Sequence, residues 1–413
     1  MPDKLSKWIE ENLLNLNYKR KSLDRYKKVL SSLNLKYPEE IILIGGTNGK
    51  GSLSELVTEL ARQSNLSVGT FTSPHLLNFN ERIKIDGEEI SDEIFLKFLK
   101  KIKNLKDSDD LNFYQIISLA ALYYFNKLNL NLWVLEIGMG GRLDPMNSLE
   151  PDISVITKVA LDHQEFLGDT IEDIAAEKAE IARSEKPLIV GSKKVPNAIL
   201  DKASKINSIL ISQRNNKKSN FLKNLLKHFS QSKAISEEVL FCLYQISKRS
   251  KFKFSNELIL KVSENTKLHG RLSLIGNTLI DSAHNEDSIK NLIDYIHLNF
   301  KNKKLNLFFS CSEQKDPHKL LKPFEGLIDK IFLGGNIHDR LMPLDKVLLK
   351  TSDLNFNFIK MDSIQEIYNS VKISKPNEIN LIIGSFYFSG EFFKFLLNDK
   401  GLPLSISSLN KLY

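Results

Sequence analysis

Short apolar runs alternate with helical patterns along almost the whole chain, and this alternation restricts the possible fold more than any other feature. In the first half, strands are predicted at residues 41–44, 67–71, 132–137, 153–159 and 187–190, and helices at 23–33, 52–63, 92–104, 114–128 and 171–183. After Arg271 a second series begins, with a strand ending at 281, a helix at 288–300, and strands at 305–309, 331–334, 356–359 and 379–383. The pattern predicts an α/β fold with largely parallel sheets.

A chain of 413 residues is too long for one compact core, so about two or three domains are expected. Gly270 and a polar stretch separate the two series, and we place the boundary between residues 272 and 273. Residues 192–230 are polar and weakly patterned, which favours an irregular connection or a poorly formed subdomain. We predict two α/β domains, 1–272 and a smaller, Rossmann-like 273–413, which face each other across a cleft that holds the active site.

The composition argues against several classes of protein. Hydrophobic residues make up 42% and charged residues 26%, as in soluble globular chains, and no apolar run approaches the roughly 18 residues of a membrane span. The first residues lack a signal-peptide core, and the isolated Cys242 and Cys311 have neither metal nor redox spacing. We therefore expect a cytoplasmic protein without a membrane partner.

The net charge of +8 leaves three kinds of partner open: nucleic acid, a membrane surface or anionic small molecules. Much of the excess is lysine in Asn-rich stretches that look exposed. No basic stripe is interleaved with aromatic residues, as an RNA-binding surface would require. Anionic small molecules are therefore the favoured partners.

A glycine-rich turn with the sequence TNGKGS, residues 47–52, follows the first predicted strand and opens a helix. In such a turn, backbone N–H groups and the helix dipole face a phosphate, and the lysine neutralises its charge. The usual P-loop pattern has Ser or Thr directly after the lysine, whereas Gly51 intervenes here. A turn without a ligand is the alternative, but four glycines around one lysine favour a phosphate site.

Polar residues also follow two other predicted strands. Glu136 closes one strand and precedes Gly138, Gly140 and Gly141, and His163 follows the strand at 153–159. Because ligands bind at the carboxyl ends of parallel strands, Glu136, His163 and Lys50 are expected to converge. Glu136 could instead be structural and His163 an ordinary core histidine. Beside a triphosphate, the two side chains would suit Mg²⁺.

Lys178 lies on the apolar stripe of the helix at 171–183, in line with Ile171, Ile174 and Ile181. A lysine on a buried face must pair, shift its pKa or be modified. Alternatively, its side chain extends along the surface to reach water.

Ordered motifs resemble folylpolyglutamate synthase and its bifunctional relative dihydrofolate synthase, of the Mur ligase superfamily. They are residues 46–52 (GTNGKGS), 72–76 (TSPHL), 80–83 (NERI), 135–144 (LEIGMGGRLD), 160–163 (ALDH), 177–179 (EKA), 270–271 (GR), 280–285 (IDSAHN), 315–316 (KD) and 384–386 (GSF). The resemblance covers nearly the whole chain and is lost only at about residues 192–260.

The resemblance implies an ATP-dependent ligase with a P-loop ATPase domain. ATP phosphorylates a carboxylate, and the amine of L-glutamate attacks the acyl phosphate to form an amide. The implied cofactors are ATP and Mg²⁺, and the implied substrates are dihydropteroate or folates and L-glutamate. The implied catalytic residues are Lys50, Lys178, which would be carbamylated, and His284. ATP would be held by Asn48, Gly49, Lys50, Gly51, Ser52, Arg271 and Asp281, and Mg²⁺ by Ser73, Glu136 and His163.

The acid substrate would contact Tyr114, Gln115, Leu143, Asp144, Pro145 and Ser385, and residues 142–144 resemble the bifunctional branch. Departures from the family pattern are Gln115 for Glu, Pro145-Met146 for Ala-Thr, Glu180 for Gly, Lys233 for an ATP-contacting Asn and Glu286 for Pro. The phosphate and metal positions match, whereas the substrate-facing positions differ. We therefore expect a dihydrofolate synthase and folylpolyglutamate synthase whose substrate preference is not standard.

Other interpretations remain open. A ligase for a nucleotide-linked cell-wall precursor is disfavoured by Gly51. A catalytically degenerate paralogue that binds nucleotide or folate, or a ligase for another pterin-like acid, fits the departures. A nucleic-acid-binding protein is suggested only by the charge and is disfavoured. We expect a monomer.

Overall fold

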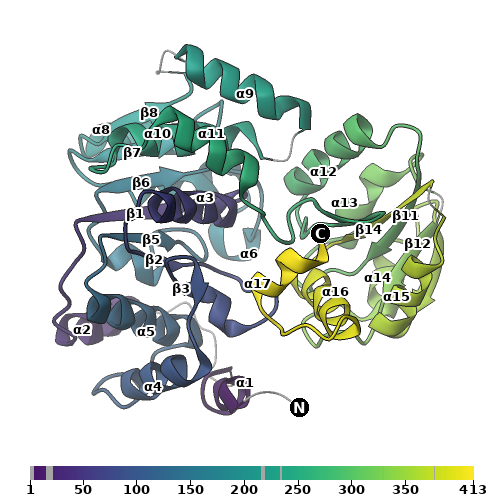
Figure 1. Cartoon of the computed structure of the whole chain (residues 1–413), viewed down its shortest axis with the longest axis horizontal. Helices are drawn as coiled ribbons and strands as arrows, with labels where there is room; N and C mark the ends of the chain where they lie inside the picture. The colour runs from purple at the N-terminus through teal and green to yellow at the C-terminus, as the bar shows by residue number, and fades with distance from the viewer. Residues whose placement is uncertain (1–3, 15–21, 215–218, 233–234, 329, 376) are drawn as a thin grey trace. The chain divides into compact units, whose positions relative to one another are not determined.

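The computed structural model describes residues 4–14, 22–214, 219–232, 235–328, 330–375 and 377–413. The chain divides into two compact units. The first consists mainly of residues up to 74, 79–230 and 235–266, and the second mainly of residues 75–78 and 267–413. Both units are α/β, as predicted (Figure 1). The division falls at residue 266, while the predicted boundary at residue 272 stays a prediction.

The first unit contains an eight-stranded sheet with the order β4-β3-β2-β5-β1-β6-β7-β8. Its strands are β1 Glu40–Gly45, β2 Val68–Phe71, β3 Ile83–Ile85, β4 Glu88–Glu89, β5 Leu132–Glu136, β6 Ile153–Ile156, β7 Pro187–Val190 and β8 Ile209–Ser212. All pairs are parallel except β2–β3 and β3–β4. The central strand β1 is buried on both faces, which explains its continuous apolar run.

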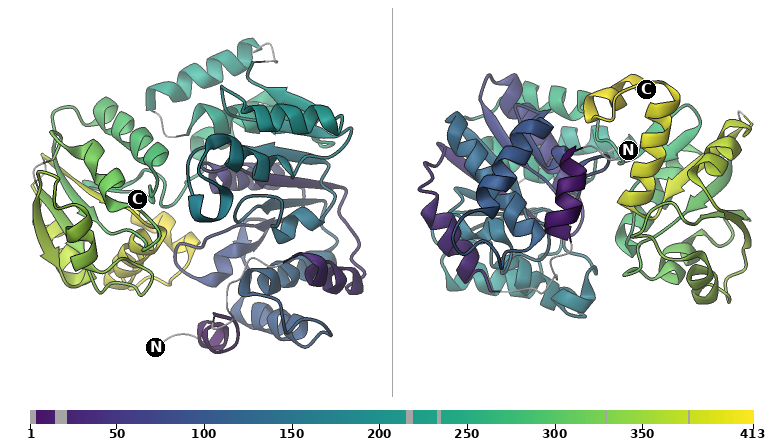
Figure 2. Two further views of the ribbon diagram at one scale, coloured as in Figure 1. Left: turned by 180° about the vertical axis from the view of Figure 1, so that it is seen from behind. Right: turned by 90° about the horizontal axis from the view of Figure 1, so that it is seen from below.

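Helices cover both faces of this sheet (Figure 2). They are α1 Lys4–Ile9, α2 Asp24–Ser32, α3 Lys50–Gln63, α4 Asp92–Lys103, α5 Phe113–Leu128, α6 Gln164–Leu167, α7 Ile171–Ala179, α8 Asn197–Lys205, α9 Asn220–Ser232, α10 Glu237–Arg249 and α11 Asn256–Asn265. Helix α3 packs against α10 and α11, α4 against α5, and α7 against α8. Short helical turns lie at Glu10–Leu14, Phe79–Arg82 and Pro145–Ser148.

The prediction of an irregular connection at residues 192–230 is wrong, because helix α8, strand β8 and most of α9 lie there. These elements are at the edge of the sheet, where a helix buries few side chains. Only Ile199 and Ala203 of α8 are buried, so the apolar periodicity is weak. Residues 215–218 lie outside the described residues.

Two predicted elements end earlier than expected. Strand β6 stops at Ile156, and the hydroxyl of the next residue, Thr157, bonds the Gly45 and Asn48 carbonyl oxygens. Helix α7 stops at Ala179, and the Arg183 guanidinium donates to the carbonyl oxygens of residues 180–182, which have no partner within the helix. Ile171 on the predicted stripe is 38% exposed, whereas Ile174 is buried. The other predicted strands and helices are present, with ends shifted by a few residues at most.

The second unit contains a six-stranded sheet with the order β13-β12-β11-β14-β10-β9. Its strands are β9 Ser273–Ile275, β10 Thr278–Ile280, β11 Lys304–Phe309, β12 Lys330–Gly334, β13 Asn357–Met361 and β14 Glu378–Ile383. Only β9–β10 is antiparallel. The helices are α12 Glu286–Asn299, α13 Pro317–Leu321, α14 Leu344–Lys350, α15 Ile364–Lys372, α16 Phe386–Asp399 and α17 Ile406–Leu409, with turns at Lys322–Phe324 and Asn410–Leu412.

Two apolar cores lie on the two faces of this second sheet. Helices α12, α13 and α14 contribute to one core, and α15, α16 and α17 to the other. The short segment 75–78 belongs to the second core through Leu76 and Leu77. Gly390 of α16 lies directly against the Leu76 carbonyl, where a side chain would collide. Among the described helices, none has both the length and the apolar character needed to cross a membrane.

Candidate active site

The glycine-rich turn between β1 and α3, residues 46–51, is called the phosphate loop below. Gly46 has a φ of 137°, and a side chain there would collide with the Thr157 hydroxyl. That hydroxyl lies 2.7 Å from the Asn48 carbonyl oxygen and 3.2 Å from that of Gly45. Gly49 has a φ of 89° and precedes the first helical residue, Lys50. The loop therefore presents the N-terminus of a 14-residue helix, as an anion site requires.

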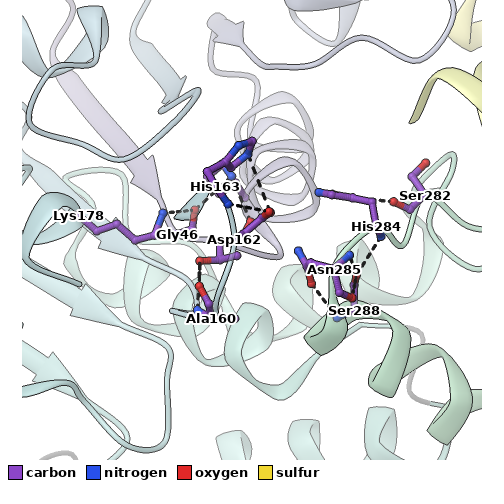
Figure 3. A network of polar contacts seen from close by, with 11 residues as sticks. Gly46, Ala160, Asp162, His163, Lys178, Ser282, His284, Asn285 and Ser288 are labelled. Atoms are coloured by element: carbon purple, nitrogen blue, oxygen red, sulfur yellow. Dashed lines mark hydrogen bonds and ion pairs between the residues drawn. The ribbon is translucent and has the colours of Figure 1, made fainter. Parts of the chain in front are cut away.

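Two lysines converge on the phosphate loop. Lys50 Nζ donates to the carbonyl oxygens of Gly46 and Thr47, at 3.1 and 3.2 Å. Lys178 Nζ, from α7, donates to the same Gly46 oxygen at 3.0 Å (Figure 3). Lys178 is only 3% exposed, so its side chain does not run along the surface to water. Two ammonium groups thus share one acceptor atom in the first unit.

Glu136 ends strand β5 beside the phosphate loop. It lies in register with Ile44 of β1, and its side chain is 3% exposed. Its Oε2 accepts the backbone N–H of Ser73 at 3.1 Å. A Cβ at Gly51 would lie 3.8 Å from the same oxygen, which is ordinary van der Waals contact, so the start of α3 lies next to the carboxylate. This contact would tolerate a side chain and does not explain the extra glycine.

The chain from Thr157 to His163 runs along the other side of the phosphate loop. Thr47 N–H donates to the Lys158 carbonyl at 2.6 Å, and the Thr47 hydroxyl bonds Ala160. His163 follows with a φ of 52° and precedes α6. Its Nε2 is 3.9 Å from Asp162 Oδ2 (Figure 3). The structure thus ties the strand end that carries His163 to the loop that carries Lys50.

The predicted metal ligands Ser73, Glu136 and His163 include only two side chains of the types that commonly bind metals. In the described part of the chain, no three or more His, Cys, Asp or Glu side chains gather as a metal site. A Mg²⁺ site completed by a serine hydroxyl and phosphate oxygens would need no third side chain of these types.

Residues 138–144, called the glycine loop below, follow Glu136. A Cβ at Gly138 would lie 2.7 Å from the Tyr114 ring, and the Tyr114 hydroxyl donates to the Glu136 carbonyl at 3.3 Å. Burial, and then the nearby Asp144, raise the pKa of the Tyr114 phenol well above its usual value. Tyr114 thus lies against the glycine loop as a neutral aromatic side chain.

The glycine loop also contacts α7. A Cβ at Gly141 would lie 2.5 Å from the Glu177 carbonyl oxygen and 3.1 Å from Lys178 Cα. The Arg142 backbone N–H donates to that Glu177 carbonyl at 3.1 Å, and Arg142 Nε donates to the Glu177 carboxylate at 2.9 Å. The loop therefore connects the residues around Glu136 with the helix that carries Lys178.

Two of the predicted substrate contacts, Asp144 and Gln115, bond the backbone in this structure, and their contact with a substrate stays a prediction. Asp144 Oδ2 accepts the N–H of Gly138 at 2.9 Å, and Oδ1 accepts that of Met146 at 2.9 Å. Burial raises the pKa of Asp144 to about 7, although these backbone hydrogen bonds oppose the shift. Gln115 Oε1 accepts the Asn112 N–H at 3.1 Å and completes a capping box at the start of α5. Leu143 and Pro145 flank Asp144, and Pro145 begins a short 3₁₀ turn.

Four predicted site residues lie in the second unit. Asp281 accepts the backbone N–H groups of Leu272 and Ala283, both at 2.8 Å, and burial raises its pKa. His284 Nδ1 lies 2.8 Å from the Ser282 carbonyl, so Nδ1 carries the proton (Figure 3). The Arg271 guanidinium carbon is 4.5 Å from the Phe386 ring centroid, and Ser385 caps α16.

The departures at Glu286 and Lys233 have different outcomes. Glu286 is the first residue of α12, where its negative charge interacts favourably with the helix dipole. Its family counterpart, proline, is also suited to that position. Lys233 lies outside the described residues.

Sequence reasoning missed two residues that shape the site. Thr157 braces the phosphate loop, and its position directly after β6 at the carboxyl edge was an available signal. The second is Arg183, whose guanidinium donates to the carbonyl oxygens of Asn147 and Leu149 at 2.9 and 2.8 Å and so links the two segments. No sequence pattern marked Arg183, because its partners are backbone oxygens.

Comparisons with known proteins agree with this architecture. The Mur ligase middle domain matches residues 44–259. A dihydrofolate synthase/folylpolyglutamate synthase of Haemophilus influenzae is 29% identical over 408 residues, which cover 90% of this chain and 92% of the relative.

Two solved structures have the same fold. Escherichia coli FolC in complex with DHPP and ADP aligns with a TM-score of 0.86 and 25% identity, covering 97% of this chain and all of that one. The bifunctional enzyme of Yersinia pestis, complexed with AMPPNP and a Mn ion, aligns with a TM-score of 0.83 at 23% identity, with 97% of this chain and 100% of that one covered. The chain is therefore a member of the Mur ligase family, in the branch of the dihydrofolate synthase/folylpolyglutamate synthases.

Proposed function

We propose that the protein is an ATP-dependent ligase that joins L-glutamate to dihydropteroate and to folates. The observation that carries the proposal is the phosphate loop with Lys50, which lies beside the buried carboxylate of Glu136. Similarity over nearly the full length to dihydrofolate synthase/folylpolyglutamate synthases supplies the reaction class. A helix N-terminus and a lysine suit a triphosphate, and ADP is bound by the Escherichia coli relative.

The phosphate loop binds and steadies the phosphates of ATP. The γ-phosphoryl group passes to an oxygen of the acid substrate and ADP leaves. The glutamate amine then attacks the acyl carbon, the amide C–N bond forms, and phosphate departs with the carboxylate oxygen. A proton lost from the amine completes the balance. Lys50 supports the first step, because it neutralises charge on the transferred group.

The side chains of Ser73, Glu136 and His163 would hold Mg²⁺. A buried carboxylate, a hydroxyl and an imidazole next to a phosphate site are a suitable donor set for an ion that keeps phosphate oxygens and waters as its other ligands. When bound, the ion would neutralise phosphate charge. Within the chain, Ser73 N–H orients the Glu136 carboxylate by donating to Oε2.

Lys178 would be carbamylated in the active enzyme. Its Nζ and that of Lys50 both donate to the Gly46 carbonyl oxygen, at 3.0 and 3.1 Å. The distance between the two nitrogens therefore cannot exceed the sum of these two hydrogen-bond lengths. Two cations at that separation repel each other in a buried site. Carbamylation converts one of them into an anion, and the repulsion becomes attraction.

Tyr114, Leu143 and Asp144 would contact the pterin part of the substrate, and Arg271, Asp281, His284 and Ser385 would contribute from the second unit. Tyr114 offers an aromatic face next to the glycine loop. The roles of Gln115 and Pro145 toward the substrate, the cytoplasmic location and the monomeric state are further proposals from the sequence. The phosphate-site geometry favours an active enzyme over a degenerate paralogue.

The test is phosphate release by the purified full chain with ATP, Mg²⁺, L-glutamate and either dihydropteroate or tetrahydrofolate. We expect release that requires both glutamate and the acid, with products heavier by one glutamyl residue in mass spectrometry. Release that does not depend on glutamate, or no release with either acid, would overturn the proposal.

A further inference from the structure

The second unit has a topological switch point at the carboxyl edge of its sheet. Strands β11 and β14 are neighbours there, but the chain leaves β11 toward α13 and β14 toward α16, which lie on opposite faces. Ligands of open α/β sheets bind at such switch points. Ser312 and Ser385, which follow the two strands, approach each other with their hydroxyl oxygens 3.5 Å apart.

Arg340 is directed toward this switch point from the loop after β12. Its Nη1 donates to the Tyr387 hydroxyl at 2.6 Å, and its guanidinium carbon lies 5.3 Å from the Tyr387 ring centroid. Tyr387 is the second residue of α16, and its backbone N–H donates to the Ser385 hydroxyl at 3.1 Å. The Arg340 guanidinium, from the loop after β12, is thus held next to Ser385 and Tyr387, which follow β14.

The loop that carries Arg340 is fixed in place. The His338 ring stacks on Tyr387 with centroids 4.7 Å apart, and its Nδ1 accepts the Arg340 backbone N–H at 3.1 Å. The Met342 N–H donates to the Cys311 carbonyl at 2.8 Å, which ties the loop to the end of β11. Such bracing is what a specificity residue needs to hold its geometry.

The charge of Arg340 is not used within the described residues. Its contacts there are the phenol and ring of Tyr387, and it forms no ion pair with any described carboxylate. The residue is exposed. A planar guanidinium binds a carboxylate through two parallel hydrogen bonds. The site is therefore suited to a small molecule that carries a carboxylate.

We propose that Arg340 binds the side-chain carboxylate of the incoming L-glutamate and determines the preference for that amino acid. This role rests on the proposed ligase function. His284, assigned to the reacting end, follows β10 on one side of β14, whereas Arg340 follows β12 on the other side. The His284 ring centroid lies 5.7 Å from that of Phe386, and Arg340 bonds the next residue, Tyr387. An amino acid with its amine near His284 would thus extend its far carboxylate along these two residues toward Arg340.

The decisive variant is Arg340→Gln, which removes the charge but keeps a hydrogen-bonding side chain. We expect the KM for L-glutamate to rise about 10- to 100-fold, as loss of a charge-assisted pair predicts, with kcat changed less than about threefold. The KM values for ATP and dihydropteroate should not change. The preference for glutamate over glutamine in kcat/KM should fall at least about tenfold, because glutamine lacks the charge that Arg340 reads.

Three further variants complete the experiment. Lys360→Gln removes an exposed charge from β13, paired with Asp345 at 3.1 Å, and should change nothing. Tyr387→Phe removes only the hydroxyl that holds Arg340 and should raise the KM for glutamate a few-fold. Arg340→Lys keeps the charge without the planar fork and should be intermediate, provided that thermal unfolding shows both Arg340 variants folded.

Two results would overturn the proposal. Unchanged glutamate KM in Arg340→Gln would remove Arg340 from the amino-acid site. Equal losses with glutamate and glutamine would mean that it contacts a group common to both, not the side-chain carboxylate. Absence of glutamate-dependent phosphate release in the unmodified protein would instead refute the ligase function itself, and this role with it.

Discussion

The phosphate loop and the glycine loop follow the neighbouring strands β1 and β5, yet their polar side chains are used differently. The phosphate loop is shaped by glycines and braced by Thr157, and its Lys50 ammonium group donates to two carbonyl oxygens of the loop. In the glycine loop, Asp144 instead accepts backbone N–H groups of its own region with both carboxylate oxygens. The two loops therefore differ in which backbone groups their motif side chain bonds, carbonyl oxygens in one and N–H groups in the other.

Lys50→Ala should have the largest effect. Removing the charge beside the phosphates should lower the rate of phosphate release by about 100- to 1,000-fold, with the thermal unfolding midpoint nearly unchanged. The matched control is Lys97→Ala, which removes an exposed lysine from α4 of the same unit. Near-normal turnover in Lys50→Ala would end the assignment of the phosphate loop.

Lys178→Ala should lower phosphate release by about 10- to 100-fold, and added acetate should restore part of it by replacing the carbamate. The chemical measurement is ¹³C NMR after incubation with labelled bicarbonate, in which the unmodified protein should show a carbamate signal. Lys178→Arg keeps the charge but cannot form a carbamate, so acetate should not restore its activity. A missing signal with full activity would refute the modification.

Asp144 should make stability depend on pH. Its folded pKa of about 7 lies above the ordinary aspartate pKa of 3.8, so the folded state keeps a proton that the unfolded state releases. The stabilisation is complete below about pH 4 and is lost as the pH rises to about 7, with an upper limit of about 4 kcal/mol. Thermal unfolding at about pH 4 and about pH 8 measures this loss, and Asp144→Asn, which resembles the protonated acid, should reduce it.

Kinetics of Asp144→Ala test whether the Asp144 carboxylate contacts the pterin of the substrate. If the carboxylate also contacts the pterin, the KM for dihydropteroate should rise roughly 10- to 100-fold, and the KM for tetrahydrofolate less. Equal increases for both substrates, together with a lower unfolding midpoint, would show that the residue acts only through the glycine loop.

Gln115→Glu should have the smallest effect. A glutamate oxygen can accept the Asn112 N–H as Gln115 Oε1 does, so stability should change by less than about 0.5 kcal/mol. If the side chain also faces the substrate, the restored family residue should shift the KM for dihydropteroate while stability stays constant. No shift in either quantity would confine Gln115 to the helix cap.

Much of the fold followed from apolar periodicity, because long buried strands such as β1 and β14 leave a clear signal. The region of α8 and β8 was missed because an edge element buries too few side chains to show a period. The burial of Lys178 was predicted from its helical position. The shared use of the Gly46 carbonyl oxygen by two lysines was not predicted, since it joins the phosphate loop and the start of α3 to α7, which only the folded chain brings together.

The segment 75–78 has a consequence for how this chain can be cut. Leu76 and Leu77 lie in the apolar core of the second unit, and the Leu76 carbonyl oxygen packs so closely on Gly390 that no side chain would fit there. A fragment that starts at residue 267 would lack segment 75–78 and expose the apolar surface that this segment covers. Neither unit is one continuous piece of sequence, so recombination between relatives at a single crossover near residue 267 would combine segment 75–78 of one parent with the core of the other.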